Sequence, residues 1–211
     1  MAKFVSGRKI NIFLLSSSLY VSFQFFANVL STKIALLPYL NLAIDGGTVI
    51  YPLTFTLRDF VHKTHGKKDA RQVIIIAASL NAVMFGLFWL VGKMTPDPTW
   101  QFQRAYDQIL LPVGRIVLAS IIAQVISELI DTEIFSRVYK KFNDTLAVFL
   151  SNTVGLVADS LIFSFIAFLG ALPLSTVLQI VLANILIKFV ISTLSVPTIK
   201  LIPRTANFEE I

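Results

Sequence analysis

Apolar residues dominate six segments of the chain, and polar residues recur on one face of several of them. The clearest case lies between residues 111 and 134, where an apolar run is interrupted at Ser120, Gln124, Ser127, Glu128 and Asp131. At about 100° per residue, these five positions fall within roughly a quarter turn of one helix face. Charged groups in such a helix are costly unless they face a cavity, a partner or a substrate. The pattern therefore predicts a membrane-spanning helix with one polar, inward-facing side.

The apolar segments predict a single membrane domain, residues 1–211, folded as an all-α bundle of six membrane-spanning helices. A span takes about 20 residues, and every segment except the second approaches that length. With boundaries placed at proline, glycine and polar residues, the expected spans are residues 10–30, 48–61, 73–91, 111–134, 146–169 and 174–196. The segment Ile34–Ile44 is apolar but too short to span. We expect it to be either a bent extension of the first helix or a re-entrant piece enclosed by protein.

Composition and charge support this class of protein and give it an orientation. Only 14% of the 211 residues are charged, against about 25% in soluble domains, and cysteine is absent. Of the lysines and arginines outside the spans, twelve fall on the side that holds both termini and three on the other. The positive-inside rule then places both termini in the cytoplasm. The net charge of +6 therefore indicates membrane orientation, and no nucleic-acid partner is expected.

Polar groups in the other spans extend the predicted polar interior. Asn28 lies in the first span, Asn152 and Asp159 share a face of the fifth, and Lys188 lies in the sixth. Glu128 and Lys188 have similar expected depths, so we expect them to pair, with Asp159 above them. Such charges either form an ion pair that only fixes the bundle or line a substrate cavity. Polar stripes on four spans favour the cavity, and hence transport.

The sequence contains no pattern typical of an enzyme, a resident cofactor or a metal centre. It lacks a phosphate-binding P-loop, a nucleophile elbow and a zinc-protease motif. His62 and His65 have no third ligand at a fitting spacing, so we expect no metal site. An intramembrane enzyme is kept as an alternative, although the sequence contains no set of catalytic residues that argues for it.

Four sequence elements occur together between about residue 20 and residue 196. They are Asn28 followed by Lys33, Gly47–Phe55 with Asp59, Arg115–Ser120 continuing to Ser127–Asp131, and Asp159-Ser160 with Gly170. Together they resemble the queuosine precursor transporter family, also called the vitamin uptake transporter family. The resemblance implies a six-helix protein of the bacterial inner membrane, similar to the substrate-binding subunits of energy-coupling-factor vitamin transporters. It also implies import of a 7-deazaguanine, such as the cyano or aminomethyl form, or of queuine. Family members usually carry glutamine where this chain has Glu128.

A deazaguanine suits the polar residues of the spans. Its guanine-like edge presents a ring N–H and an exocyclic amine side by side, which a carboxylate accepts in two strong bonds. Amide side chains can serve its carbonyl and remaining donors. The substrate-binding residues expected from the stripes and the resemblance are Asn28, Lys33, Gln124, Glu128, Asn152, Asp159 and Lys188, with Asp159 or Glu128 as the main carboxylate.

Partners follow from this hypothesis. We expect a deazaguanine substrate, the lipid bilayer, and either a second copy of the chain or energising subunits. The alternative is a substrate-binding subunit for another vitamin, which docks on a separate ATP-driven complex.

Overall fold

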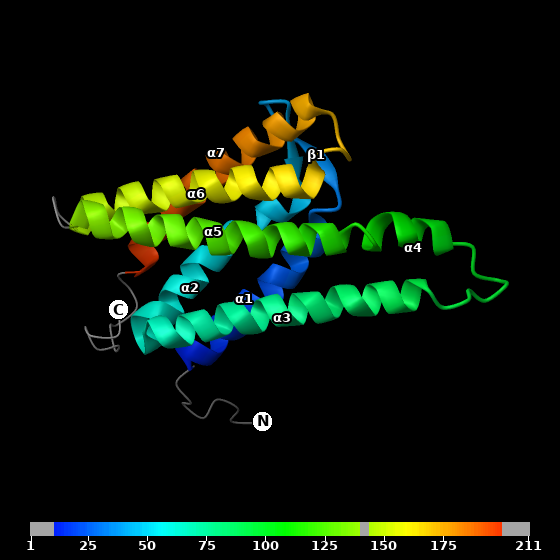
Figure 1. Cartoon of the computed structure of the whole chain (residues 1–211), viewed down its shortest axis with the longest axis horizontal. Helices are drawn as coiled ribbons and strands as arrows, with labels where there is room; N and C mark the ends of the chain where they lie inside the picture. Colours follow the sequence, from blue (N-terminus) through cyan, green and yellow to red (C-terminus); the bar gives the residue numbers. More distant parts are fainter. Residues whose placement is uncertain (1–10, 140–143, 200–211) are drawn as a thin grey trace, which may run out of the picture.

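The computed structural model describes residues 11–139 and 144–199. Within these ranges some helix side chains are not described, those of Glu128, Asp131 and Asn152 among them. The fold is helical apart from one short hairpin (Figure 1). The elements, in chain order, are α1 (Ile12–Leu30), β1 (Ile34–Leu37), β2 (Leu42–Asp45), the 3₁₀ turn η1 (Gly46–Val49), α2 (Pro52–His65), α3 (Lys67–Gly92), α4 (Gln103–Leu110), α5 (Val113–Tyr139), α6 (Asp144–Phe168) and α7 (Leu174–Ile199).

Helices occupy all six segments in which the sequence predicts spans. Among the described residues, four stretches are long and apolar enough to cross a membrane: Ile12–Leu30, Lys68–Gly92, Gln103–Ser127 and Leu174–Ile191. In α6 the described apolar part, Thr153–Phe168, is shorter, and α2 has only 14 residues. The structure thus supports a membrane protein with at least four helices of spanning length. Between the third and fourth expected spans, residues 103–110 form a further short helix, α4.

The segment Ile34–Ile44 is not a bent extension of the first helix, because most of it forms an antiparallel β-hairpin. Ile34 pairs with Asp45, and Leu37 pairs with Leu42. The intervening turn contains Pro38, and Asn41 adopts a positive φ of 50°, which asparagine tolerates better than most residues. The Ala43 N–H donates to Oε1 of Gln179 on α7 at 3.1 Å. A side chain therefore satisfies a strand backbone group that would be costly to leave unpaired in an apolar environment.

Helices α5 and α6 lie side by side along most of their length (Figure 1). A small residue on α5 favours this close approach, because Ala119 is completely buried in one cluster with Ala167 and Phe168 of α6. At one end, Arg115 Nε and Nη2 donate to the carbonyls of Ile166 and Leu169 at 2.6 and 2.5 Å. These carbonyls belong to the C-terminal turn of α6 and the residue after it, where backbone acceptors have no partner within the helix. Arg115 therefore caps its neighbouring helix and fixes the register of the pair.

Two apolar clusters flank the middle of the molecule. One joins the hairpin to α5, α6 and α7, with members Ala43, Ile116, Ala119, Ala167, Phe168, Val177 and Ile180. The other joins α1, α2 and α3, with members Tyr20, Leu57, Val61, Ala70, Val73 and Ala77. Of the polar residues predicted to face inwards, those that the structure describes as buried are Asn28, Ser120, Gln124, Ser127, Asp159 and Lys188.

Candidate functional site

A cavity lies where the C-terminal half of α1 meets the 3₁₀ turn η1, α5, α6 and α7. It is a small, partly open cavity of about 20 Å³, enough for roughly one water molecule. Its lining residues are Ala27, Asn28, Ser31, Asp45, Gly47, Thr48, Tyr51, Ser120, Phe163, Asn184 and Lys188. Two aromatic rings and a set of amide, hydroxyl and charged groups therefore converge on one small space.

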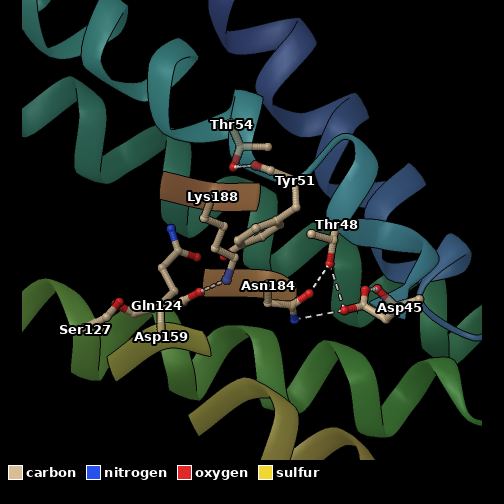
Figure 2. Close-up of polar contacts among 10 residues, drawn as sticks. Asp45, Thr48, Tyr51, Thr54, Gln124, Ser127, Asp159, Asn184 and Lys188 are labelled. Atoms are coloured by element: carbon tan, nitrogen blue, oxygen red, sulfur yellow. Dashed lines mark hydrogen bonds and ion pairs between the residues drawn. The ribbon is translucent and has the colours of Figure 1, made fainter. Parts of the chain in front are cut away.

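Lys188 and Asp159 form a buried ion pair beside this cavity (Figure 2). Lys188 Nζ lies 2.5 Å from Asp159 Oδ2, and both side chains are 3% exposed. The same ammonium lies 5.1 Å from the centre of the Tyr51 ring, within the range of a cation–π interaction. The sequence analysis paired Lys188 with Glu128. In the structure Lys188 pairs with Asp159 on α6, because α6 and α7 bring the two side chains to the same depth. The side chain of Glu128 lies outside the described residues, so its pairing with Lys188 stays a prediction.

Asp159 keeps one acceptor available. Its Oδ1 is buried and, among the described residues, has no hydrogen-bond partner. A buried carboxylate oxygen left unpaired is unfavourable, since it has lost water without gaining a donor. This oxygen is therefore a place where an incoming N–H group would be stabilised.

Asp45 is a second buried carboxylate of the site, and its acceptors are occupied. Its side chain is 1% exposed. Oδ1 accepts from Ser31 Oγ at 2.7 Å and from the Gly47 N–H at 3.1 Å. Oδ2 accepts from Asn184 Nδ2 at 3.0 Å and faces Thr48 Oγ1 at 2.9 Å (Figure 2). Asp45 therefore joins α1, η1 and α7 at the cavity wall.

A chain of amides orients Asn28. Asn81 on α3 donates its Nδ2 to the Ala77 carbonyl at 2.9 Å, so its Oδ1 must face Asn28. Asn28 Nδ2 donates to that oxygen at 2.7 Å. Because Asn28 lines the cavity and its amide nitrogen is engaged, it presents its carbonyl oxygen as an acceptor.

The polar stripe of α5 faces inwards as predicted for three of its five residues. Ser120, Gln124 and Ser127 are buried, and Ser120 lines the cavity. Gln124 Nε2 donates to Tyr20 Oη on α1 at 2.8 Å, so this amide links two helices beside the cavity. The other two members, Glu128 and Asp131, have side chains outside the described residues.

The seven predicted site residues thus divide into three groups. Asn28 and Lys188 line the cavity, while Asp159 and Gln124 are buried next to it. Lys33 is exposed and does not line the cavity, because it lies beyond the C-terminus of α1 where the chain turns into the hairpin. Glu128 and Asn152 lie outside the described side chains and stay predictions.

Sequence reasoning missed Asp45 and Thr48 as site residues. The available signal is the run Asp45-Gly46-Gly47-Thr48, whose last two residues begin an element of the family resemblance, although the sequence pattern assigned neither Asp45 nor Thr48 to the site. A carboxylate beside two glycines also indicates a close approach of backbone to polar groups. Added at Gly47, a Cβ would lie 2.1 Å from Ser31 Oγ and 2.5 Å from the Ala27 carbonyl oxygen. Glycine is therefore required for the hairpin to meet α1 at this point.

Comparison with known proteins gives a consistent result. The family described as "Putative vitamin uptake transporter" matches residues 45–202, well over half of the chain. "Probable queuosine precursor transporter" of Bacillus subtilis (strain 168) is 27% identical over 155 residues, covering 72% of this chain and 68% of the relative. "Queuosine precursor transporter" of Escherichia coli (strain K12) is 30% identical over 122 residues, covering 58% of this chain and 54% of the relative.

A third relative adds to this agreement. "Probable queuosine precursor transporter" of Haemophilus influenzae (strain ATCC 51907 / DSM 11121 / KW20 / Rd) is 29% identical over 125 residues, covering 58% of this chain and 51% of the relative. The matched region therefore spans only about half the length of two of these relatives. No solved structure matches the chain. All three relatives are named for a queuosine precursor, so the alternative of another vitamin is not favoured.

Proposed function

This chain belongs to the vitamin uptake transporter family, a family of transporters and not of enzymes, and we propose that it imports a 7-deazaguanine precursor of queuosine. The substrate would be the cyano or aminomethyl form, or queuine. The observation that carries the proposal is the buried pair of Asp159 and Lys188 beside a cavity, with Asp159 Oδ1 free of partners among the described residues. A carboxylate with a free acceptor next to an ammonium suits the guanine-like edge of this ligand.

The chemistry of that edge supports the pairing. A deazaguanine presents a carbonyl oxygen next to a ring N–H, which is followed by an exocyclic amine. Asp159 would accept from the two nitrogen donors, and Lys188 would donate to the carbonyl. Each bond involves a charged partner, and such bonds are shorter and roughly twice as strong as neutral ones. Because Lys188 lines the cavity and Asp159 lies behind it, binding requires Lys188 to move aside from its present contact.

Other cavity groups complete the proposed site. The carbonyl oxygen of Asn28 would accept from the pyrrole N–H of the ligand. Tyr51 and Phe163 line the same cavity and supply aromatic faces for a flat heterocycle. Gln124, which donates to Tyr20, would hold α1 and α5 in place beneath the ligand. The cavity as it stands holds about one water molecule, so a bicyclic base would enter it only if Lys188 and the neighbouring side chains moved apart.

The membrane arrangement forms part of the proposal. The chain would be a single domain in the bacterial inner membrane with six spans, the short α2 and the half-described α6 included. Both termini would be cytoplasmic, because twelve of the lysines and arginines outside the spans lie on that side. The bundle would be similar to the substrate-binding subunits of energy-coupling-factor transporters, and a second copy or energising subunits would be its protein partners.

Binding and uptake measurements test the substrate. Calorimetry of the purified protein with 7-cyano-7-deazaguanine should give binding, and Asp159→Asn should weaken it roughly ten- to a hundredfold, because one strong charged bond is lost. Glu128→Gln is the matched control, since glutamine is usual there in the family. Normal binding by Asp159→Asn together with a loss in Glu128→Gln would reassign the carboxylate. Absence of binding to the parent chain would overturn the proposed substrate. Uptake by cells expressing only this chain would show that no energising subunit is needed.

A further inference from the structure

The segment that joins α3 to α5 carries large apolar side chains on its outer surface. Met94, Phe102 and Ile109 are each more than half exposed, and Trp100 is 42% exposed. None of them lines the cavity, so the proposed substrate site makes no use of them. Exposed apolar patches mark interaction sites. We name residues 89–111, which hold the end of α3, the following loop and α4, the α3–α4 arm.

Polar side chains of α4 turn towards α3 instead of outwards. Gln103 Nε2 donates to the Gly92 carbonyl at 3.2 Å and to Asp107 Oδ1 on its own helix at 2.9 Å. Tyr106 Oη donates to the Phe88 carbonyl at 3.0 Å. A surface helix in water has the opposite arrangement, with its apolar face towards the protein. An apolar face outside and hydrogen-bonded polar groups inside suit a helix that contacts lipid.

The arm extends beyond the level at which the neighbouring helices end. Arg115 Nη2 donates to the Leu169 carbonyl, so the end of α6 lies level with the first turn of α5. Because α4 continues in the direction of α5, it extends past the turn between α6 and α7 (Figure 1). Its eight residues add about 12 Å at 1.5 Å per residue. The stretch that is apolar enough to cross a membrane nevertheless begins at Gln103 and includes α4.

Charged groups in the arm indicate a position at the membrane surface. At the tip, the Thr99 hydroxyl and N–H both donate to Asp97 Oδ1, which lowers the pKa of this carboxyl and keeps it ionised. Lys93 Nζ lies 5.9 Å from the centre of the Trp89 ring, and Arg104 is exposed. Among the residues that the structure describes, neither cation forms a salt bridge. Tryptophan rings beside such cations are typical of the headgroup layer of a bilayer.

We propose that the α3–α4 arm is a binding surface for phospholipid headgroups, in the leaflet that the C-terminus of α3 reaches. Phe102 and Ile109 contact the upper part of the acyl chains, and Trp100 lies at the level of the headgroups. Lys93 and Arg104 bind the lipid phosphates. The fourth span therefore begins within α4. The proposal needs only a chain embedded in a membrane, and it is independent of the substrate.

Tryptophan fluorescence tests this surface, because the two tryptophans of the chain, Trp89 and Trp100, both lie in the arm. Trp89→Phe leaves Trp100 as the single fluorophore. In phosphatidylcholine vesicles brominated near the headgroup end of the acyl chains, Trp100 should lose most of its emission, while iodide in the water should quench it little. Adding Phe102→Ser and Ile109→Ser should reverse this order, because the arm loses its apolar contacts. Gln108→Ser, on the same helix, is the matched control and should change nothing.

The same system distinguishes the two other occupants of this face, water and a second copy of the chain. Quenching of Trp100 by iodide but not by brominated lipid would place the arm in water and overturn the proposal. Ile109→Cys tests the second copy, since the chain has no cysteine of its own. It should stay monomeric under oxidation in vesicles. Disulfide-linked dimers that persist as the lipid-to-protein ratio rises would assign the face to a second copy and overturn the proposal as well.

Discussion

Lys188 Nζ lies 2.5 Å from Asp159 Oδ2, and this ion pair between α7 and α6 is almost completely shielded from solvent. Removing one partner would leave the other charge buried and unpaired, which typically costs about 3–5 kcal/mol. Because Lys188 also lines the cavity, changes to this pair should affect both the stability of the bundle and the cavity.

Variants of this pair should show strong coupling. Lys188→Met and Asp159→Asn should each lower stability, while the double variant should lose less than the sum of the two. Thermal unfolding of the three purified variants measures this difference. A parallel cycle with Glu128→Gln and Lys188→Met should be additive, because Lys188 already has its partner. Additivity in the Asp159 cycle, with coupling in the Glu128 cycle, would restore the pairing first expected from the sequence.

Gly47→Ala should disturb the meeting of η1 and α1. The added Cβ would lie within 2.5 Å of the Ala27 backbone oxygen and even closer to Ser31 Oγ, so the backbone must shift. We expect a lower melting temperature and weaker ligand binding together. Gly86→Ala on α3 is the control, because nothing lies within 4 Å of its Cβ and alanine favours a helix by up to about 1 kcal/mol. Equal melting temperatures for both variants would contradict the close approach.

Asn81→Ala should weaken substrate binding although Asn81 does not line the cavity. Without the Asn81 oxygen, the Asn28 amide loses the bond that fixes which of its ends faces the ligand. Affinity should fall roughly five- to tenfold, corresponding to about 1 kcal/mol for a neutral hydrogen bond. Ser79→Ala, on the exposed face of the same helix, should bind normally. Unchanged affinity in Asn81→Ala would mean that packing alone orients Asn28.

The orientation can be tested with single cysteines, because the chain has none of its own. Lys68 lies in the first turn of α3, and Thr99 lies in the loop between the C-terminus of α3 and α4. In intact cells an impermeant thiol reagent should label Thr99→Cys and leave Lys68→Cys unlabelled until the cells are opened. The reverse pattern would place both termini outside.

The hydrophobic pattern alone determined most of the fold. Long apolar segments in water-poor surroundings must satisfy their own backbone, so helices were the expected result at all six places. The same pattern oriented α5, because Ser120, Gln124 and Ser127 share a face and that face is buried. It did not find the hairpin. Pro38 and Asn41 mark a turn, but the backbone of the hairpin also has a partner on α7, where Gln179 accepts from the Ala43 N–H across 136 residues of sequence.

Only the tertiary structure decided which polar residues meet. Depth along a helix, which the sequence gives, could not identify Asp159 on α6 as a partner of Lys188. That choice depends on how α5, α6 and α7 are rotated and how closely they pack. Asp45 shows the same limit, since its neighbours come from α1, η1 and α7 and are brought together only by the glycine contact. The sequence determined which residues face inwards, because burial follows periodicity. Partners depend on distances between helices, which no single helix encodes.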